Sequence, residues 1–275
     1  AEMAGVKTDE HGMVPEDLER VLRQTTAMGR KPKFIYTIPS FQNPEGSLLP
    51  LERRRRVLEL AQQYEVPVLE DDCYVDLCFE GTVPPAIASL DGDGRVIYVG
   101  SASKIVAPGV RLGWVVAPEE VVGRLLTIKL DAGTNEFAAI TVHRYLKEHL
   151  QEHVAEINAV LRAKRDAMLA ALGETFPPTV WWSRPTGGMY LWVRLPEGAD
   201  AEAIQPKAVA EGVGYYPGNL FSPAGVGKNY LRLCFGYPTI EEIHEGIRVL
   251  ARVFEREGAF APKKRGGAAV DAENC

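Results

Sequence analysis

Short apolar runs alternate with amphipathic segments along the first half of the chain. Apolar residues recur at three- and four-residue steps over 15–23 and 51–64, and this spacing predicts two helices. Four short runs rich in β-branched and aromatic residues predict strands at 34–38, 66–69, 96–99 and 112–117. Strands that alternate with helices and are apolar throughout are typical of a parallel sheet that is covered on both faces.

The pattern changes after about residue 135. Apolar positions at helical spacing predict a long helix over about 138–172, with a break near His149. The remaining predicted elements are alternating runs at 189–195 and 230–235 and helices at 201–211 and 240–256. We therefore expect an α/β protein with three parts: part of a large domain over 1–148, a connecting helix and smaller α+β domain over 149–258, and a disordered tail over 259–275.

Composition narrows the class of protein. The chain has 275 residues, 46% of them hydrophobic, and a formal net charge of −6, which opposes binding to nucleic acid or to an anionic membrane. No apolar run approaches the roughly 18–20 residues that span a bilayer. The four cysteines form no C-x-x-C pair, and the five histidines show no metal-binding pattern. We expect reduced thiols in a cytoplasmic protein without a metal site.

Polar clusters follow three of the predicted strands. They cover residues 39–46, 70–74 and 100–104, and the last continues through 108–114. Taken singly each is weak, because an aspartate after a strand more often caps a helix and a lone lysine is usually solvated. Because ligands bind beyond the carboxyl ends of parallel strands, we expect the clusters to meet at one edge of the sheet. Together they would bring an amine, carboxylates, a phenol, an amide, hydroxyls and a guanidinium to one place.

Five segments in order carry a resemblance to a known family. They read P-S-F-Q-N-P-E-G, V-L-E-D-D-C-Y, G-S-A-S-K-I-V-A-P-G-V-R-L-G-W, R-P-T-G-G-M-Y-L-W and N-Y-L-R-L-C-F. The chain from about residue 33 to 256 resembles the fold-type I pyridoxal-phosphate enzymes, specifically the class I and II aminotransferases and their 2-aminoadipate branch. The resemblance implies the pyridoxal-phosphate transferase fold, a pyridoxal 5'-phosphate cofactor, amino acid and 2-oxo acid substrates, and a homodimer with sites at the subunit boundary.

The resemblance also implies roles for residues of the first domain. Lys104 would form a Schiff base with the cofactor and then move a proton, which requires burial and Arg111 to lower its pKa. Asp71 would keep the pyridine nitrogen protonated; Asp72 is its rival, and the three-residue step from Asp71 to Tyr74 favours Asp71. The other expected cofactor contacts are Tyr74 and Asn43 at the ring oxygen, and Ser101, Ser103 and Arg111 at the phosphate.

In the later part of the chain, Arg232 lies in an alternating strand. An exposed strand arginine is the usual interpretation, but the resemblance implies that Arg232 grips the substrate α-carboxylate, which Asn43 would also approach. Ala102 departs from the family, which usually has an aromatic residue at that position.

The chain also lacks a part of the family pattern. The family's upstream portion, with a phosphate-cradling helix start and an aromatic that stacks on the cofactor, has no counterpart in residues 1–33, so we expect an N-terminally incomplete sequence. Two alternatives to the aminotransferase stay open: the sensing domain of a bacterial transcription regulator, and a pyridoxal-phosphate lyase. The amino donor is not determined by these residues.

Overall fold

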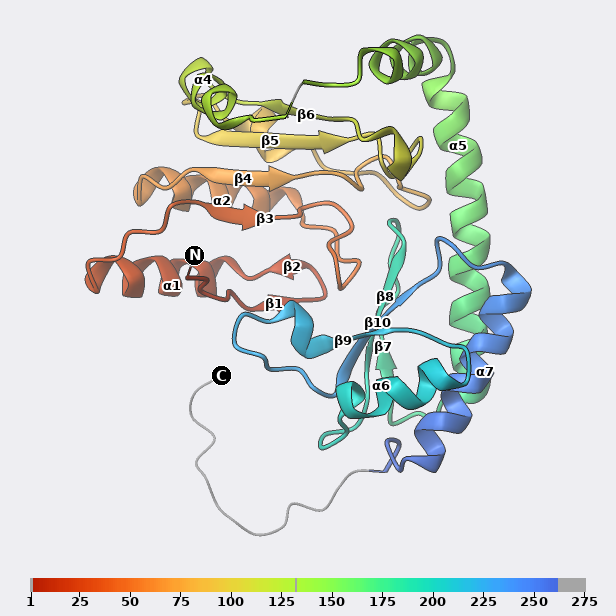
Figure 1. Cartoon of the computed structure of the whole chain (residues 1–275). Coiled ribbons are helices and arrows are strands. Elements are labelled where there is room, and N and C mark those ends of the chain that lie inside the picture. The colour runs from red at the N-terminus through yellow and green to blue at the C-terminus, as the bar shows by residue number, and fades with distance from the viewer. Residues whose placement is uncertain (1, 132, 262–275) are drawn as a thin grey trace.

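The computed structural model describes residues 2–131 and 133–261, and these form two four-stranded sheets joined by a long helix (Figure 1). The first sheet has the order β3-β4-β5-β6, with strands β3 (Ile35–Thr37), β4 (Val68–Asp71), β5 (Val96–Ser101) and β6 (Gly113–Val116). The strands β3, β4 and β5 are parallel, as predicted, but β6 runs antiparallel to β5.

Two helices form a core with the parallel strands. Helix α1 (Pro15–Ala27) begins with a proline at its first turn, and α2 (Leu51–Gln63) follows Pro50. Their apolar stripes pack with the inward residues of the strands in one buried cluster that includes Leu18, Leu22, Val57, Leu60 and Val68. Two segments that the sequence pattern did not predict, the hairpin of β1 (Thr8–Asp9) and β2 (Gly12–Met13) and the short helix α3 (Ile87–Leu90), complete this region.

The prediction of a sheet covered on both faces is wrong at its β6 edge. All four residues of β6 are exposed, and α4 (Glu119–Ile128), another element that was not predicted, has no buried residue among those described. A hydrophobic strand at an open edge normally requires a cover. Within the described residues nothing covers this one.

Helix α5 (Glu136–Thr175) is continuous over 40 residues, so the predicted break near His149 is wrong. Its start is capped by Asn135, whose side chain accepts a hydrogen bond from the Ala138 amide. In Figure 1 it runs from the level of α4 down to α7 (Ile240–Arg256). Its C-terminal half contributes Leu161, Met168 and Leu172 to the second core.

The second sheet has the order β7-β8-β10-β9, with all neighbouring strands antiparallel. Its strands are β7 (Trp181–Trp182), β8 (Tyr190–Arg194), β9 (Tyr216–Pro217) and β10 (Tyr230–Cys234). Helices α6 (Ala201–Ala210) and α7 belong to the same unit, and α7 begins with a capping box between Thr239 and Glu242. This α+β arrangement is the one predicted for the later part of the chain.

The apolar core of the second sheet extends into loops of the first. Phe41, Tyr74, Leu77 and Ile105 belong to the same buried cluster as β8 and β10. At the other end of the chain, Ala259 is buried and Phe260 packs on Phe176, so the first residues of the predicted tail are part of the fold. The rest of that predicted tail, 262–275, lies outside the described residues.

Candidate active site at the carboxyl ends of the parallel strands

The polar clusters predicted after the three strands lie at one edge of the first sheet. Asp71 ends β4 and pairs in register with Val99 of β5, and the Asp72 amide donates to the Val99 carbonyl at 2.9 Å. Ser101 ends β5, and Lys104 follows in the turn beyond it. Because β3, β4 and β5 are parallel, their carboxyl ends present these side chains on the same side of the sheet.

Lys104 lies next to the phenol of Tyr74. The amine Nζ is 5.8 Å from the centre of the Tyr74 ring, and Lys104 is half-buried. Tyr74 itself is buried, and its hydroxyl lies 3.4 Å from that of Tyr190. Burial and this hydrogen bond raise the pKa of Tyr74, so the phenol keeps its proton at neutral pH. The site therefore holds an amine beside a protonated phenol.

The two candidate aspartates have different surroundings. Asp71 is half-buried and its Oδ2 accepts a hydrogen bond from the Tyr36 hydroxyl at 2.8 Å. Asp72 is only 2% exposed, and burial raises its pKa despite the nearby Ser40 and Arg54. Asp71 is therefore the carboxylate that a ligand can reach, and Asp72 is enclosed by the protein. Tyr36 was not among the predicted site residues; its place one strand away, on an exposed position of β3, gave no signal.

The predicted phosphate-binding residues form a short polar turn. The Ser101 hydroxyl accepts from the Ser103 amide at 3.1 Å, and it also lies 3.4 Å from the Leu112 carbonyl, to which it donates. Arg111 is exposed, and its Nη1 donates to the Pro108 carbonyl at 3.1 Å. Hydroxyl and guanidinium donors of this kind are suited to phosphate oxygens.

Backbone strain marks the same edge. Arg111 adopts a left-handed conformation with φ of 53°, and Phe41, two residues before Asn43, does so with φ of 55°. Glu65, in the turn after α2, is the other non-glycine residue with positive φ in the described part of the chain. Such conformations cost about 1–2 kcal/mol each and concentrate at functional sites. Arg111 and Phe41 lie in the segments that carry the predicted phosphate-binding residues and Asn43.

Arg232 reaches the site from the second sheet. Its Nη1 donates to the Asn43 Oδ1 at 2.7 Å, so residues 189 positions apart in the chain meet. Its Cζ lies 4.2, 4.6 and 5.0 Å from the ring centres of Tyr190, Tyr216 and Phe221. Instead of an exposed strand arginine, Arg232 is a half-buried cation between three aromatic rings. Its buried Nε has no hydrogen-bond partner within the described residues.

These groups fit the chemistry of pyridoxal phosphate. Lys104 supplies the amine that an aldehyde requires, Asp71 a carboxylate for a pyridinium nitrogen, and Tyr74 a protonated phenol for a ring oxygen. The orphaned Nε of Arg232 shows that this guanidinium has donor capacity left for an additional acceptor such as a carboxylate.

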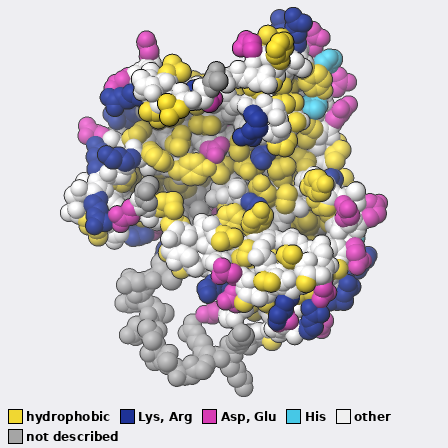
Figure 2. Space-filling view, in the orientation of Figure 1, with side chains coloured by type: hydrophobic (Ala, Val, Ile, Leu, Met, Phe, Trp, Pro, Cys, Tyr) yellow, Lys and Arg dark blue, Asp and Glu magenta, His cyan; other side chains and the backbone are white. Residues whose placement is uncertain are grey.

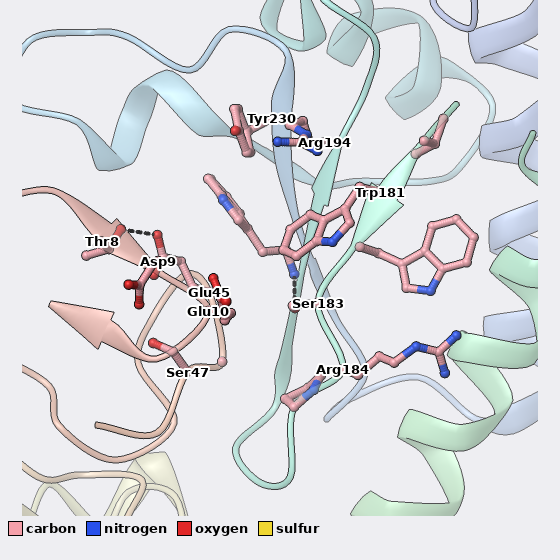
Figure 3. A pocket seen from close by; sticks show the side chains of 15 residues that line it. Thr8, Asp9, Glu10, Glu45, Ser47, Trp181, Ser183, Arg184, Arg194 and Tyr230 are labelled. Carbon is pink, nitrogen blue, oxygen red and sulfur yellow. Dashed lines mark hydrogen bonds between the residues drawn. The ribbon is translucent and has the colours of Figure 1, made fainter. Parts of the chain in front are cut away.

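A cavity of about 750 Å³ lies beside this site and not at it (Figure 3). One wall is the β1–β2 hairpin with Glu45 and Ser47, and the opposite wall carries Trp181 and Arg194. The residues that line the cavity include none of the predicted site residues. Burial raises the pKa of Glu45, which also accepts a hydrogen bond from the Thr8 hydroxyl.

Two other kinds of site are missing from the described residues. Over 2–131 and 133–261, no group of three or more His, Cys, Asp or Glu side chains could hold a metal ion. Over the same ranges, no helix has the length and apolarity needed to cross a membrane. The three cysteines described, Cys73, Cys78 and Cys234, are free thiols, and burial together with the charge of Asp71 raises the pKa of Cys73 to about 12.

The chain is similar in sequence and structure to known aminotransferases. Residues 3–250 match the family model of aminotransferase class I and II. A curated relative, aromatic-amino-acid aminotransferase 1 of Thermococcus litoralis, is 41% identical over 93% of this chain and 62% of its own length. The crystal structure of LysN, the α-aminoadipate aminotransferase of Thermus thermophilus, complexed with N-(5'-phosphopyridoxyl)-L-leucine, has a TM-score of 0.86 at 37% identity, covering 93% of this chain and 66% of that one.

The chain is also similar to a protein of another class. The uncharacterised HTH-type transcriptional regulator YdfD of Bacillus subtilis is 31% identical over 89% of this chain and 50% of its own length. The chain thus spans less than two thirds of the two enzymes and half of the regulator.

Proposed function

We propose that this chain, which belongs to the class I and II aminotransferase family, is the cofactor- and substrate-binding part of a pyridoxal-phosphate-dependent aminotransferase. The protein would move an amino group from an amino acid to a 2-oxo acid. The observation that carries the proposal is the series of contacts from Lys104 through Tyr74 and Tyr190 to Arg232 and Asn43. It joins an amine at the end of one sheet to a carboxylate-binding cation on the other.

Each side chain has a task that its surroundings support. Pyridoxal phosphate, when bound, supplies an electron-withdrawing ring that stabilises negative charge on the substrate α-carbon. Asp71 would hold the proton on its ring nitrogen, Tyr74 and Asn43 would bind its ring oxygen, and Ser101, Ser103 and Arg111 would bind its phosphate.

The substrate would be held and acted on by two cations. Arg232 would bind the α-carboxylate with its guanidinium, and Lys104 would carry the proton to and from the α-carbon. Because the Asn43 oxygen accepts from Arg232, its amide hydrogens are directed to other acceptors, which suits a residue that touches both cofactor and substrate.

The enzyme is favoured over the regulator and the lyase. Identity to the aromatic-amino-acid aminotransferase is 41%, against 31% to the regulator. The matched family model and the two enzymes compared above are named aminotransferases, which favours transamination over the lyase reaction. The amino donor is not proposed.

We also expect a homodimer in the cytoplasm. Hydrophobic side chains gather over the hollowed middle of the face in Figure 2. The exposed apolar residues on β6, α4 and the start of α5 include Trp114, Val116, Leu126, Ile128 and Phe137. Exposed apolar residues that gather on one face are typical of a protein–protein interface, and a second copy of the chain would cover them in a homodimer. The free thiols support a reducing compartment.

Replacing Lys104 tests the proposal. The complete protein with pyridoxal phosphate should show a visible absorbance band and transaminate at least one member of an amino-acid panel, and K104A should lose both the protein-dependent band and turnover. The matched control is K147A, which removes an exposed lysine of α5. Full transaminase activity in K104A would refute the assignment. A basic helix-turn-helix segment upstream, with no turnover, would favour the regulator.

A further inference from the structure

Tyr190 lies at the centre of the contacts that connect the two halves of the site. It is the first residue of β8 and is 8% exposed. The face of its ring lies 4.2 Å from the guanidinium carbon of Arg232, and its hydroxyl lies 3.4 Å from that of Tyr74. A single side chain therefore contacts the proposed carboxylate-binding cation and the proposed ring-oxygen ligand.

The backbone holds both phenols in place. Tyr190 pairs with Cys234 across β8 and β10 and follows the Gly187–Gly188 turn. In that turn the Gly188 amide donates to the Leu77 carbonyl at 2.7 Å, and a Cβ on Gly187 would come within 2.3 Å of the same carbonyl, so only glycine fits. The Leu77 amide in turn donates to the Tyr74 carbonyl at 2.9 Å. The rings of Tyr74 and Tyr190 meet edge to face with their centres 5.7 Å apart.

The direction of the hydrogen bond between Tyr74 and Tyr190 follows from the number of protons that each phenol can donate. A phenol has one proton and can accept from another donor while it gives that proton away. If Tyr74 donates to the ring oxygen of the cofactor, it must accept from Tyr190. A donor that is itself hydrogen-bonded in this way becomes a stronger donor.

We propose that Tyr190 is a positioning residue that donates its hydroxyl proton to Tyr74, directs the proton of Tyr74 to the cofactor ring oxygen, and supports Arg232 with its ring face. This inference rests on the proposed function, because it assigns Tyr190 a task toward pyridoxal phosphate. The side chain of Tyr190 would have two separate effects. Its hydroxyl would act on the cofactor through Tyr74, and its ring would act on Arg232, the proposed substrate-binding cation. Neither effect requires Tyr190 to touch the reacting atoms.

The test removes the hydroxyl and keeps the ring. In the complete protein saturated with pyridoxal phosphate, Y190F should raise the pH at which the visible absorbance band changes by about half a unit, the size expected for loss of one modest hydrogen bond. The KM for the amino acid should change less than twofold, because the ring still faces Arg232. Y190A, which removes the ring as well, should raise that KM about tenfold or more.

The matched control is Y216F. The Tyr216 ring also faces Arg232, at 4.6 Å, and Tyr216 makes no hydrogen bond to Tyr74 in the part of the chain that the structure describes. The absorbance midpoint of Y216F should equal that of the wild type. An unmoved midpoint in Y190F, in a protein whose thermal unfolding is unchanged, would overturn the inference and leave the proposed function standing. A wild-type protein with no visible band would overturn both.

Discussion

Arg54 allows a direct test of what stabilises the loop that carries Asn43. It lies in α2 and is fully buried. Its guanidinium donates hydrogen bonds to the carbonyls of Leu49 at 2.9 Å, Pro85 at 3.2 Å and Pro39 at 3.1 Å, and to the hydroxyl of Ser40 at 3.1 Å. Two of these acceptors begin the loop that carries Asn43. Arg54 therefore ties that loop to α2 and to the segment before α3.

Charge adds to the effect of the hydrogen bonds. Burial lowers the pKa of Arg54, and the nearby carboxyl groups of Asp72 and Glu70 oppose that shift. R54M fills much of the volume but leaves buried carbonyls without donors and two buried carboxyl groups without a cation. Loss of one partner from such a buried arrangement costs about 3–5 kcal/mol of unfolding free energy.

Urea unfolding followed by circular dichroism measures the change directly. The control is R55M, because Arg55 is the next residue of α2 and is exposed. We expect R55M to lose less than about 0.5 kcal/mol. If R54M lost no more than R55M, the guanidinium would contribute nothing net, and the argument from its four hydrogen bonds would be refuted.

Two carboxylates should change stability with pH in opposite directions. The hydrogen bond to Arg53 lowers the pKa of Asp9. The stability from Asp9 is therefore present above the ordinary aspartate pKa and is lost as pH falls through the lower folded value. D9N should flatten the acid limb of a plot of unfolding free energy against pH, and an unchanged acid limb would contradict this. Burial raises the pKa of Glu70, although its carboxylate accepts hydrogen bonds from the Ile87 and Ala88 amides at 2.8 Å each. The stability from this group is present below the ordinary glutamate pKa and is lost as pH rises through the raised folded value. Wild type should therefore lose unfolding free energy relative to E70Q over that rise in pH, and parallel curves for the two proteins would argue against it.

The edge of the sheet at which the polar clusters meet could be predicted, because it depends on local rules. Short apolar runs predict strands, parallel strands share a carboxyl end, and polar residues directly after each run must then lie together. The structure places Asp71, Ser101 and Lys104 in that arrangement. The choice of Asp71 over Asp72 rests on the family resemblance, which the three-residue step from Asp71 to Tyr74 fits. The burial of Asp72, and the charge of Arg54 from α2 that acts on its carboxyl group, depend on other elements and could not be predicted in this way.

The predictions for β6 and for a break in α5 were wrong, because the structure of both segments depends on packing that the local pattern does not show. The apolar run of β6 by itself indicates another covered strand, although the segment after β5 is too short for the helical crossover that a parallel neighbour requires. The predicted break in α5 near His149 is absent. His149 lies on an exposed side of an uninterrupted helix, where Tyr145 packs on His149 and His153.

The aromatic surroundings of Arg232 could not be found from periodicity, because they are made by register. Antiparallel pairing sets Arg232 of β10 opposite Tyr216 of β9 and brings Tyr190 from β8 to the same cation. A shift of one residue in either pairing would turn Arg232 to the other face of the sheet. The alternation over Tyr230–Cys234 indicates that the Arg232 side chain lies on the opposite side of the sheet from Leu231 and Leu233. Which side of the sheet points toward the candidate site is set by the partner strands.

The relation between the two sheets follows from the same packing. Phe41 and Tyr74, from loops of the first sheet, are buried in the core that β8 and β10 form. A hinge between the sheets would have to expose those rings, at a cost of about 1.5–3 kcal/mol for each large apolar side chain. The distance between the proposed cofactor ligands and Arg232 is therefore set by buried apolar area as well as by the hydrogen bond from Arg232 to Asn43.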